Sequence, residues 1–385
     1  MIITIATPLW PPEIGGPANY AKNLAREFQA AGHQVRVVSF YQGGKAPDAG
    51  NIKKISFVSL KFPTGVRHFL FFCKLLPKVA GADILLALDQ FSAGWPAAAA
   101  CLIFKKSLIL RVEGDFLWES FVQRTRKDIT LRKFYEKTPV LSWREHFIKM
   151  VVGWVLKKAD CLVFSSEWRK RMMVGTYRIS EMKMAIIRNV FPSPMVNNVE
   201  NCKLKIENSR IILWAGRMLY LKNLARLIHA FVKANDGSYE LYLIGDGPEK
   251  KNLQELIKKE NIAGVKFFSA ISRDKLGEKY KEAMFFVLPS FSEVGPNVIA
   301  ETVAAGILFI MTRESGYAEY IKDFGLFIDP LDEEGITSKI KMLMDKEIRG
   351  NMEKHLLQFF LYRSWQDAAC DWIMLFRDQQ SAREN

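Results

Sequence analysis

Apolar and polar positions alternate along this chain in blocks that are typical of parallel sheets covered by helices. An apolar run at 2–6 is followed by a loop rich in proline and glycine, and then by helical spacing of apolar residues at 18–31. Gly32 can end this helix, and a second apolar run occupies 34–40. This order predicts a strand, a helix and a second parallel strand. The runs ADILLALD, SLILRVEGD, ADCLVFSSE and MAIIRNV are predicted to be later strands of the same sheet.

The alternation stops at 191–209, where the chain is polar and contains two prolines, and then begins again. The stretch is therefore a predicted linker. Beyond it, the strand-like runs RIILWAGR, ELYLIGDGP, VKFFS, MFFVLPS, LFIMT and GLFID alternate with helical ones. Because 385 residues exceed what one core usually supports, two domains are expected. We predict an α/β fold of two Rossmann-like, doubly wound domains facing each other across a cleft, at 1–190 and 210–364.

Composition restricts the class of protein. An apolar content of 49% and a charged content of 25% are typical of a globular protein, and no stretch reads as a membrane span or a signal peptide. The cysteines are scattered without a CxxC pair, so a disulfide framework or a zinc site is not expected, and a reducing cytoplasm fits best. These cysteines are Cys73, Cys101, Cys161, Cys202 and Cys370.

The net charge of +14 is unevenly distributed. Residues 1–190 contain 29 lysines and arginines against 14 aspartates and glutamates, whereas residues 191–385 contain 26 against 27. The whole basic excess therefore lies in the first half, which indicates an anionic partner for that half.

Candidate binding residues follow the predicted strands of the second half, where parallel sheets bind ligands. Arg217 and Lys222 come after IILWAG, and a Gly-Pro turn after FFVLP opens the helix NVIAETVAAG. Two cations, glycine-permitted turns and a helix N-terminus together suit a diphosphate. Alternatively, the two cations are ordinary charges of a helix start and a surface. The helix start that would face the ligand comprises Gly295, Pro296, Asn297 and Val298.

Two glutamates, Glu293 and Glu301, lie eight positions apart in SEVGPNVIAETVAAG. Carboxylates would repel a phosphate, so they are better placed on sugar hydroxyl groups, which donate hydrogen bonds to them. Glu301 could instead face solvent, although its small apolar neighbours argue against exposure. Asp246, in GDGP, is either a ligand contact or a cap of the next helix.

Four stretches resemble the retaining glycosyltransferases of the GT-B fold, specifically their family 4. They are PPEIGGPANYAKNLA, AGRMLYLKNLARLIHAF, LIGDGPEKKNLQ and PSFSEVGPNVIAETVAAG. The last is similar to the family's E-x7-E motif, with its spacing intact. The resemblance extends over nearly the whole chain, and it implies that a final helix at 365–385 packs back on the first domain.

The resemblance implies a role for each candidate. Glu293 would contact hydroxyls of the donor sugar and Glu301 those of the ribose, while Arg217 and Lys222 would neutralise the diphosphate and stabilise it as it leaves. Gly15 and Gly16 would close over the same phosphates, unless they form only a turn. The chain has no Asp-x-Asp, so the cations are expected to replace a metal. No metal and no cofactor are expected, and the nucleotide sugar, a UDP- or GDP-sugar, is a substrate.

The loop RVEGDFLWE departs from the family, in which a histidine often follows this strand. Here Gly114 and Asp115 occupy the region. Asp115 could hold the acceptor hydroxyl or stabilise an oxocarbenium-like centre, or it could be a helix N-cap. A second departure is the order Glu293-Val294-Gly295-Pro296, where the family usually has Glu-Gly-x-Pro. These changes leave the identity of the donor open.

The segment 121–158 is both basic and aromatic, with ten lysines and arginines against three acidic residues. Such a composition suits anionic lipid headgroups. The resemblance places the acceptor on the first domain, so a glycan or lipid-linked acceptor is expected. A cytoplasmic protein in peripheral contact with the inner face of a membrane follows from this interpretation. The alternative is a solvated helix whose aromatic residues pack inward. Nucleic acid is not expected, because no binding module accompanies the charge.

The leading hypothesis is an enzyme that transfers a sugar from a nucleotide diphosphate to a hydroxyl group with retention of the anomeric configuration. One alternative is a catalytically silent GT-B protein that binds sugar or serves as a scaffold. Another is a nucleotide-sugar epimerase, which would need acid and base groups around the sugar that the sequence does not offer. A dinucleotide dehydrogenase is disfavoured, since neither IGGPAN nor GDGPEK supplies Gly-x-Gly-x-x-Gly.

Overall fold

The computed structural model describes residues 1–12, 16–42, 52, 54–137, 139–193, 209–322, 324–356 and 362–384. The expected phosphate contact Gly15 and most of the expected linker lie outside these residues. The chain forms two compact units, each built from separated segments. Unit 1 comprises Met1–Leu117, Val140–Asn189 and Ser364–Asn385, and unit 2 comprises Trp118–Pro139 and Val190–Arg363.

Unit 1 contains a seven-stranded parallel sheet in the order β3-β2-β1-β4-β5-β6-β7. Its central strands are almost wholly apolar because helices cover both faces. The strands are β1 (Ile2–Thr7), β2 (Gln34–Tyr41), β3 (Lys54–Ser59), β4 (Ile84–Ala87), β5 (Ser107–Arg111), β6 (Cys161–Phe164) and β7 (Met184–Ile186).

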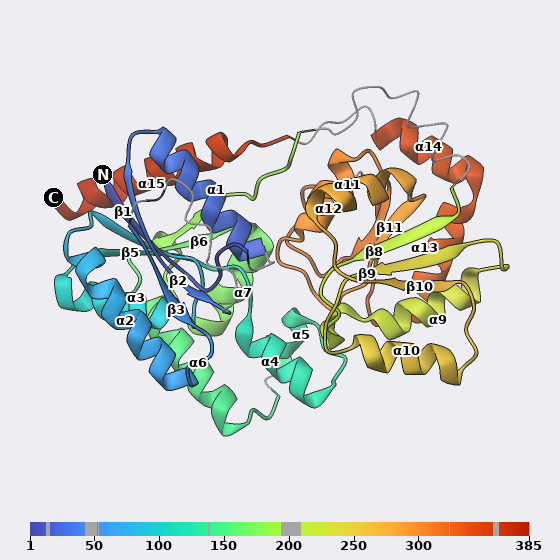
Figure 1. Ribbon diagram of the computed structural model, residues 1–385, viewed down its shortest axis with the longest axis horizontal. Helices are drawn as coiled ribbons and strands as arrows, with labels where there is room; N and C mark the ends of the chain where they lie inside the picture. Colours follow the sequence, from blue (N-terminus) through green and yellow to red (C-terminus); the bar gives the residue numbers. More distant parts are fainter. Residues whose placement is uncertain are drawn as a thin grey trace. The chain divides into compact units, whose positions relative to one another are not determined.

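The helices of unit 1 form layers on the two faces of this sheet (Figure 1). Helices α1 and α15 pack against each other, and α3 packs against both α2 and α6 on the other face. In the α15 contact, the indole of Trp372 donates a hydrogen bond of 2.8 Å to the hydroxyl of Tyr20. The helices are α1 (Gly16–Ala30), α2 (Thr64–Ala80), α3 (Gly94–Phe104), α6 (Trp143–Lys158), α7 (Glu167–Tyr177) and α15 (Trp365–Glu384), with a short 3-10 turn η1 (Glu181–Lys183).

Unit 2 contains a six-stranded parallel sheet in the order β10-β9-β8-β11-β12-β13. The strands are β8 (Ile211–Ala215), β9 (Glu240–Ile244), β10 (Val265–Phe268), β11 (Phe285–Leu288), β12 (Phe309–Thr312) and β13 (Leu326–Ile328). The helices are α9 (Leu224–Ala234), α10 (Lys250–Lys259), α11 (Arg273–Glu282), α12 (Asn297–Ala304), α13 (Glu333–Met344) and α14 (Lys346–Leu356), with a 3-10 turn η2 (Tyr220–Lys222). Helix α9 buries residues at helical spacing, namely Leu224, Leu227, Ile228 and Phe231.

The predicted pair of doubly wound α/β sheets is confirmed. In each sheet the strand order reverses once, between β1 and β4 and between β8 and β11. Loops that leave the carboxyl ends of strands on the two sides of a reversal diverge, and the crevice between them is where open α/β sheets bind ligands. In the described part of the chain, no helix is long and apolar enough to cross a membrane.

The segment Trp118–Pro139 packs with unit 2, although it lies within the range 1–190 expected for the first domain. It carries α4 (Phe116–Thr125) except for the first two residues of that helix, and all of α5 (Leu131–Lys137). The amide of Leu131 donates to the hydroxyl of Ser292 at 2.9 Å, and the guanidinium of Arg126 lies 2.5 Å from the carboxylate of Glu249. These contacts are long-range, so the local pattern of the sequence does not reveal them.

Candidate functional site

Two glycine-dependent loops position Arg217 on unit 2. A Cβ atom on Gly245 would lie 1.9 Å from the carbonyl oxygen of Gly216, so only glycine lets the loop after β9 approach the loop after β8 this closely. The amide of Met218 donates to the carbonyl of Asp246 at 2.9 Å and locks the two loops together. Arg217 is exposed at the end of β8, beside this junction.

Asp246 holds the loops after β9 and β10 in place. Its carboxylate accepts hydrogen bonds from the amide of Ala270 at 2.8 Å and from the ammonium of Lys250 at 2.6 Å. The Ala270 amide first, and Lys250 second, hold the pKa of Asp246 below its ordinary value. Asp246 is not the cap of the next helix, because Glu249 is at the N-cap of α10 and no side-chain cap hydrogen bond is formed there. Its contacts join loops, and a contact of Asp246 with a ligand stays a prediction.

Lys222 and Glu293 meet directly at the point where the strand order of unit 2 reverses. The Nζ atom of Lys222, after β8, lies 2.5 Å from Oε1 of Glu293, after β11. The same carboxylate oxygen accepts a hydrogen bond of 2.6 Å from the hydroxyl of Ser290. Asn223 fixes the turn that carries Lys222, because its side-chain amide donates to the carbonyls of Pro289 and Pro330 at 3.0 and 2.7 Å.

The backbone of Glu293 is equally constrained. Its amide donates to the carbonyl of Glu314 at 2.9 Å, and its own carbonyl accepts from the amide of Gly316 at 3.0 Å. These bonds join the loop after β11 to the loop after β12. The carboxylate is therefore presented from a rigid loop, half-buried and already paired with one cation.

Glu301 lies on the second turn of α12 and is buried. Nε of Arg273, the first residue of α11, lies 2.8 Å from one carboxylate oxygen, and the hydroxyl of Tyr280 contacts the other at 3.3 Å. Burial raises the pKa of Glu301, and the charge of Arg273 opposes that rise. A carboxylate held this way can accept hydrogen bonds from a neutral hydroxyl group without further reorganisation.

The start of α12 has the geometry of an anion-binding helix end. The helix begins at Asn297, which is exposed, and it follows the buried Pro296 and the half-buried Gly295. The amide of Ile299 already bonds the carbonyl of Pro296 at 3.0 Å. The amides of Asn297 and Val298 belong to the first turn, which has no intrahelical acceptors for them, so they can serve a ligand.

Asp115 lies in unit 1, after β5, and is buried. Its carboxylate lies 2.8 Å from the guanidinium of Arg169, whose side chain is 0% exposed. Arg169 also donates to the carbonyl of Gly114, which accepts a second hydrogen bond of 2.6 Å from the side-chain amide of Gln90. This arrangement ties the loop after β5 to α7. A contact of Asp115 with an acceptor stays a prediction.

The candidate site residues thus lie partly on unit 2 and partly on unit 1. Unit 2 brings together Lys222 and Glu293, places Arg217 on the adjoining loop after β8, and sets Glu301 on the helix that follows the Gly-Pro turn. In unit 1, Gly16 is the first residue of α1, after β1. In the described ranges, no group of three or more His, Cys, Asp or Glu side chains is placed to hold a metal ion, and metal independence stays a prediction.

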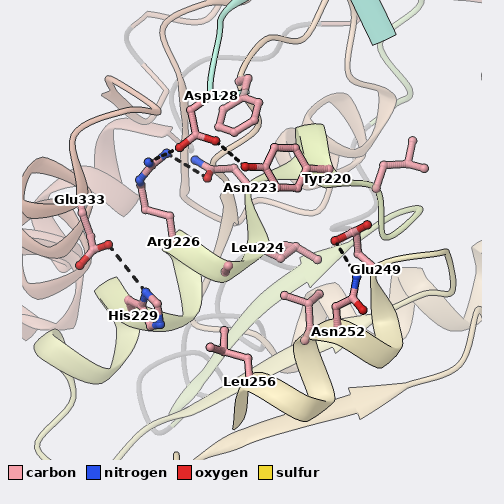
Figure 2. A pocket seen from close by; sticks show the side chains of 14 residues that line it. Asp128, Tyr220, Asn223, Leu224, Arg226, His229, Glu249, Asn252, Leu256 and Glu333 are labelled. Carbon is pink, nitrogen blue, oxygen red and sulfur yellow. Dashed lines mark hydrogen bonds and ion pairs between the residues drawn. The ribbon is translucent and has the colours of Figure 1, made fainter. Parts of the chain in front are cut away.

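A cavity of about 370 Å³ lies on unit 2 between α9, α10 and the chain at Asp128, and its lining includes Tyr220 and Asn223, on either side of Lys222 in the sequence (Figure 2). Asp128 accepts hydrogen bonds from Arg226 at 2.7 Å and from the hydroxyl of Tyr220 at 2.8 Å. Burial first, and the Asp128 contact second, raise the pKa of Tyr220 to about 12. These polar groups form hydrogen bonds with one another. We therefore interpret the cavity as part of the contact between the segment Trp118–Pro139 and the rest of unit 2.

Sequence reasoning missed three side chains that hold the candidate carboxylates, namely Ser290, Arg273 and Tyr280. Ser290 stands three residues before Glu293, so the loop PSFSE offered a local signal. Arg273 and Tyr280 lie on α11, more than twenty residues before Glu301, and no local pattern connects them to it.

Comparison with known proteins gives matches along most of the chain. The family described as Glycosyltransferase Family 4 matches residues 14–191, and the family described as Glycosyl transferases group 1 matches residues 198–357. An uncharacterized glycosyltransferase of Methanocaldococcus jannaschii is 23% identical and covers 98% of each chain. An amylovoran biosynthesis glycosyltransferase of Erwinia amylovora is 29% identical over 41% of this chain. That match spans 43% of the Erwinia protein, which is less than half of its length.

Solved structures give the same architecture. The HepE protein of Anabaena, in complex with UDP and glucose, superposes with a TM-score of 0.72 over 98% of this chain and 100% of that protein. The sequence identity is 15%, so the likeness concerns the fold.

Proposed function

Because this chain belongs to the group 1 glycosyltransferases of the GT-B fold, of the family 4 type, we propose that it transfers a hexose from a nucleotide diphosphate sugar to an acceptor hydroxyl. The proposed acceptor is a glycan or is linked to a lipid. The proposed transfer retains the anomeric configuration and uses no metal ion. The observation that carries the proposal is the pair formed by Lys222 and Glu293 where the strand order of unit 2 reverses. A cation and a carboxylate on one rigid junction suit a ligand that is anionic at one end and hydroxylated at the other.

Lys222 and Arg217 are the residues that would meet the diphosphate. The negative charge on the phosphate grows as the bond to the sugar breaks, so a fixed cation stabilises the transition state more than the bound substrate. The amides of Asn297 and Val298 at the start of α12 would add a partial positive charge from the helix dipole. Together these groups would supply the electrostatic stabilisation that a divalent metal ion supplies elsewhere.

Glu293 and Glu301 would orient the donor through its hydroxyl groups. When a diphosphate takes the place beside Lys222, Glu293 can accept hydrogen bonds from the sugar, while Ser290 keeps its carboxylate in position. Glu301, held by Arg273 and Tyr280, would accept from the ribose hydroxyls. Fixing both ends of the donor limits its motion relative to the acceptor.

The bond changes follow a same-face displacement. The bond between the anomeric carbon and the phosphate oxygen breaks, and the acceptor oxygen forms its bond to the same carbon from the same side. The departing phosphate oxygen takes the proton of the acceptor hydroxyl, so the nucleoside diphosphate leaves with that proton. No covalent enzyme intermediate is needed. The chain's part is to stabilise the leaving charge and to hold the two reactants.

The donor is proposed to be a UDP- or GDP-sugar. Structures of Anabaena HepE contain UDP or UDP-glucose, which favours UDP. The cofactor requirement is proposed to be none, since the nucleotide sugar is consumed as a substrate. A catalytically silent sugar-binding protein is the second candidate. The observation that favours it is the ion pair between Asp115 and Arg169, because this pair already engages the carboxylate that was expected to act on the acceptor.

A thermal-shift screen with UDP, GDP, ADP and their common sugar conjugates tests the donor site. A ligand that binds only the folded chain raises its melting temperature. We expect one nucleotide to raise it clearly and expect the shift to disappear in Lys222→Ala and Glu301→Ala. Lys251→Ala, a change on the exposed side of α10, is the matched control and should keep the full shift. An absence of any shift in the unmodified chain would refute the transferase proposal in this form.

Donor affinity is expected to depend on pH through Glu301. The ionised carboxylate accepts from both ribose hydroxyls, and burial raises the pKa of this group above its ordinary value. Affinity should therefore be full above that pKa and should weaken as the pH falls through it. Glu301→Gln should bind the donor more weakly by about tenfold at neutral pH and should lose this dependence. Isothermal titration from about pH 8 to about pH 5 measures both. An identical pH profile in the two proteins would show that another group is responsible.

A further inference from the structure

Helix α6 of unit 1 exposes a continuous stripe of large apolar side chains. Trp143 and Met150 are 76% and 63% exposed, and Phe147 and Trp154 are exposed as well. These positions are spaced by three or four residues, so they share one face of the helix. A stripe of two tryptophans, a phenylalanine and a methionine in water is unusual for an unpartnered surface and marks an interaction site.

The stripe is a fixed feature of the fold. The opposite side of α6 is buried in unit 1, through residues such as Ile148, Val152 and Val155. A capping box holds its first turn, because the hydroxyl of Ser142 accepts from the amide of Glu145 while the Glu145 carboxylate accepts from the Ser142 amide. The helix therefore cannot rotate to bury these exposed apolar side chains.

Only positive charges flank the stripe. The exposed charged residues of α6 are all basic, and the single acidic residue of the helix, Glu145, is buried in the capping box. The exposed basic residues are Arg144, Lys149, Lys157 and Lys158. An apolar face bordered by lysine and arginine is the pattern of helices that lie in the interface of an anionic bilayer.

The neighbouring helices continue the same surface. Helix α3 packs against α6 and α2, and the three lie side by side on one face of the sheet (Figure 1). Phe69 of α2 and Ile103 of α3 are exposed, and neither helix contains an acidic residue. Near the end of α2, burial first and then the neighbouring charges of Arg36, Lys74 and Lys54 lower the pKa of Lys78. The charged groups that shift the pKa of Lys78 are thus all cations.

The other helical layer of unit 1 is different in charge. Helix α1 carries the acidic residue Glu27, and α15 carries Asp367, Asp371 and Asp378 in addition to its basic residues. In the segment Trp118–Pro139, which belongs to unit 2, Arg126 and Arg132 pair with Glu249 and Glu314 of the same unit. Of the parts of 121–158, for which a lipid contact was expected, α6 therefore has the surface that best suits such a contact.

We propose that the layer of α2, α3 and α6 docks unit 1 on the surface of an anionic phospholipid bilayer, with the stripe of α6 inserted at the level of the headgroups. This inference rests on the proposed function, for which it supplies a reason: a lipid-linked acceptor is presented at such a surface. The charge complementarity selects a bilayer over a second copy of the chain, since two copies of this layer would bring cations against cations.

Vesicle sedimentation with the full chain tests the docking. Vesicles of phosphatidylcholine with about 30% phosphatidylglycerol should bind it, and pure phosphatidylcholine should bind it at least about tenfold more weakly, because each exposed cation adds to the attraction. The double variant Lys149→Glu/Met150→Ser should lower the partition coefficient on anionic vesicles by about tenfold or more. Lys157→Glu/Lys158→Glu, which leaves the apolar stripe intact, provides a second test if the first variant folds poorly.

The chain offers a closely matched control on the opposite layer. Met374 on α15 is 62% exposed, nearly the same as Met150, and Arg377 nearby is exposed. Arg377→Glu/Met374→Ser therefore makes the same change of charge and apolar surface, and it should alter the partition coefficient by less than about twofold. Equal losses in the two double variants would mean that net charge alone drives binding, and would overturn the proposal.

Two further outcomes would also overturn it: no binding of the unmodified chain to anionic vesicles, or a dimer in light scattering that only the α6 variant loses. Donor binding separates this proposal from the proposed function. Both double variants should keep the thermal shift of the unmodified chain with the nucleotide donor in the absence of vesicles. Vesicle binding without any nucleotide binding would refute the transferase proposal alone, and the reverse result would refute the docking alone.

Discussion

Replacing Lys222 with alanine is expected to lower kcat/KM for sugar transfer by about 10²–10³-fold, the usual effect of removing one group that stabilises charge in a transition state. Two physical reasons act in the same direction. The variant loses the cation proposed to stabilise the departing diphosphate, and it leaves the carboxylate of Glu293 without the ammonium that lies 2.5 Å away. An uncompensated carboxylate beside the phosphate would repel it. Steady-state kinetics with the donor found in the thermal screen measures the effect.

A neighbouring lysine provides the control for this experiment. Lys250, the first residue of α10, pairs at 2.6 Å with Asp246 on the loop after β9, so Lys250→Ala also removes an ammonium that pairs with a carboxylate in unit 2. It should change kcat/KM by less than about threefold, because its partner is a structural carboxylate held also by an amide. If Lys222→Ala remains folded and keeps activity within about threefold of the unmodified enzyme, the role given to Lys222 is wrong.

Replacing Asp115 with alanine is expected to destabilise the chain by about 3–5 kcal/mol, the range for breaking a buried ion pair from one side. Both partners are buried, and Arg169 would be left with a charge that has lost its counter-ion. Urea denaturation measures the free energy of unfolding. The double variant Asp115→Ala/Arg169→Met should recover most of the loss, because it removes both charges instead of one.

The conservative variant Asp115→Asn distinguishes the structural role from the catalytic one expected from the sequence. A structural role predicts a loss of stability with sugar transfer retained in the folded fraction. A catalytic role predicts the opposite, an unchanged free energy of unfolding and a loss of transfer. The second outcome would contradict the structural interpretation of the pair and would restore Asp115 to the acceptor site.

The fold class could be predicted from the sequence because its signals are local. Parallel strands that are buried on both faces are continuous apolar runs, as in β8, and a helix covering them buries residues at a spacing of three and four, as in α9. Strand β3 was missed because it lies at the edge of its sheet and is only partly buried, so its pattern is weak. The final helix was expected at 365–385, and α15 extends from Trp365 to Glu384.

In the candidate site too, local sequence predicts some features and long-range contacts set the others. The order of apolar runs, turns and helix starts in the sequence placed Lys222, Glu293 and Glu301 after predicted strands or on the helix behind one, and this made them candidates for a ligand site. Their partners come from long-range folding: Lys222 pairs with Glu293, 71 positions away, Glu301 pairs with Arg273, and Asp115 pairs with Arg169, 54 positions away. The tertiary structure also decided that α4 and α5 pack with unit 2 and that the stripe of α6 faces solvent. The physical reason is that propensity and periodicity are properties of neighbouring residues, whereas the order of strands in a sheet sets which distant loops meet.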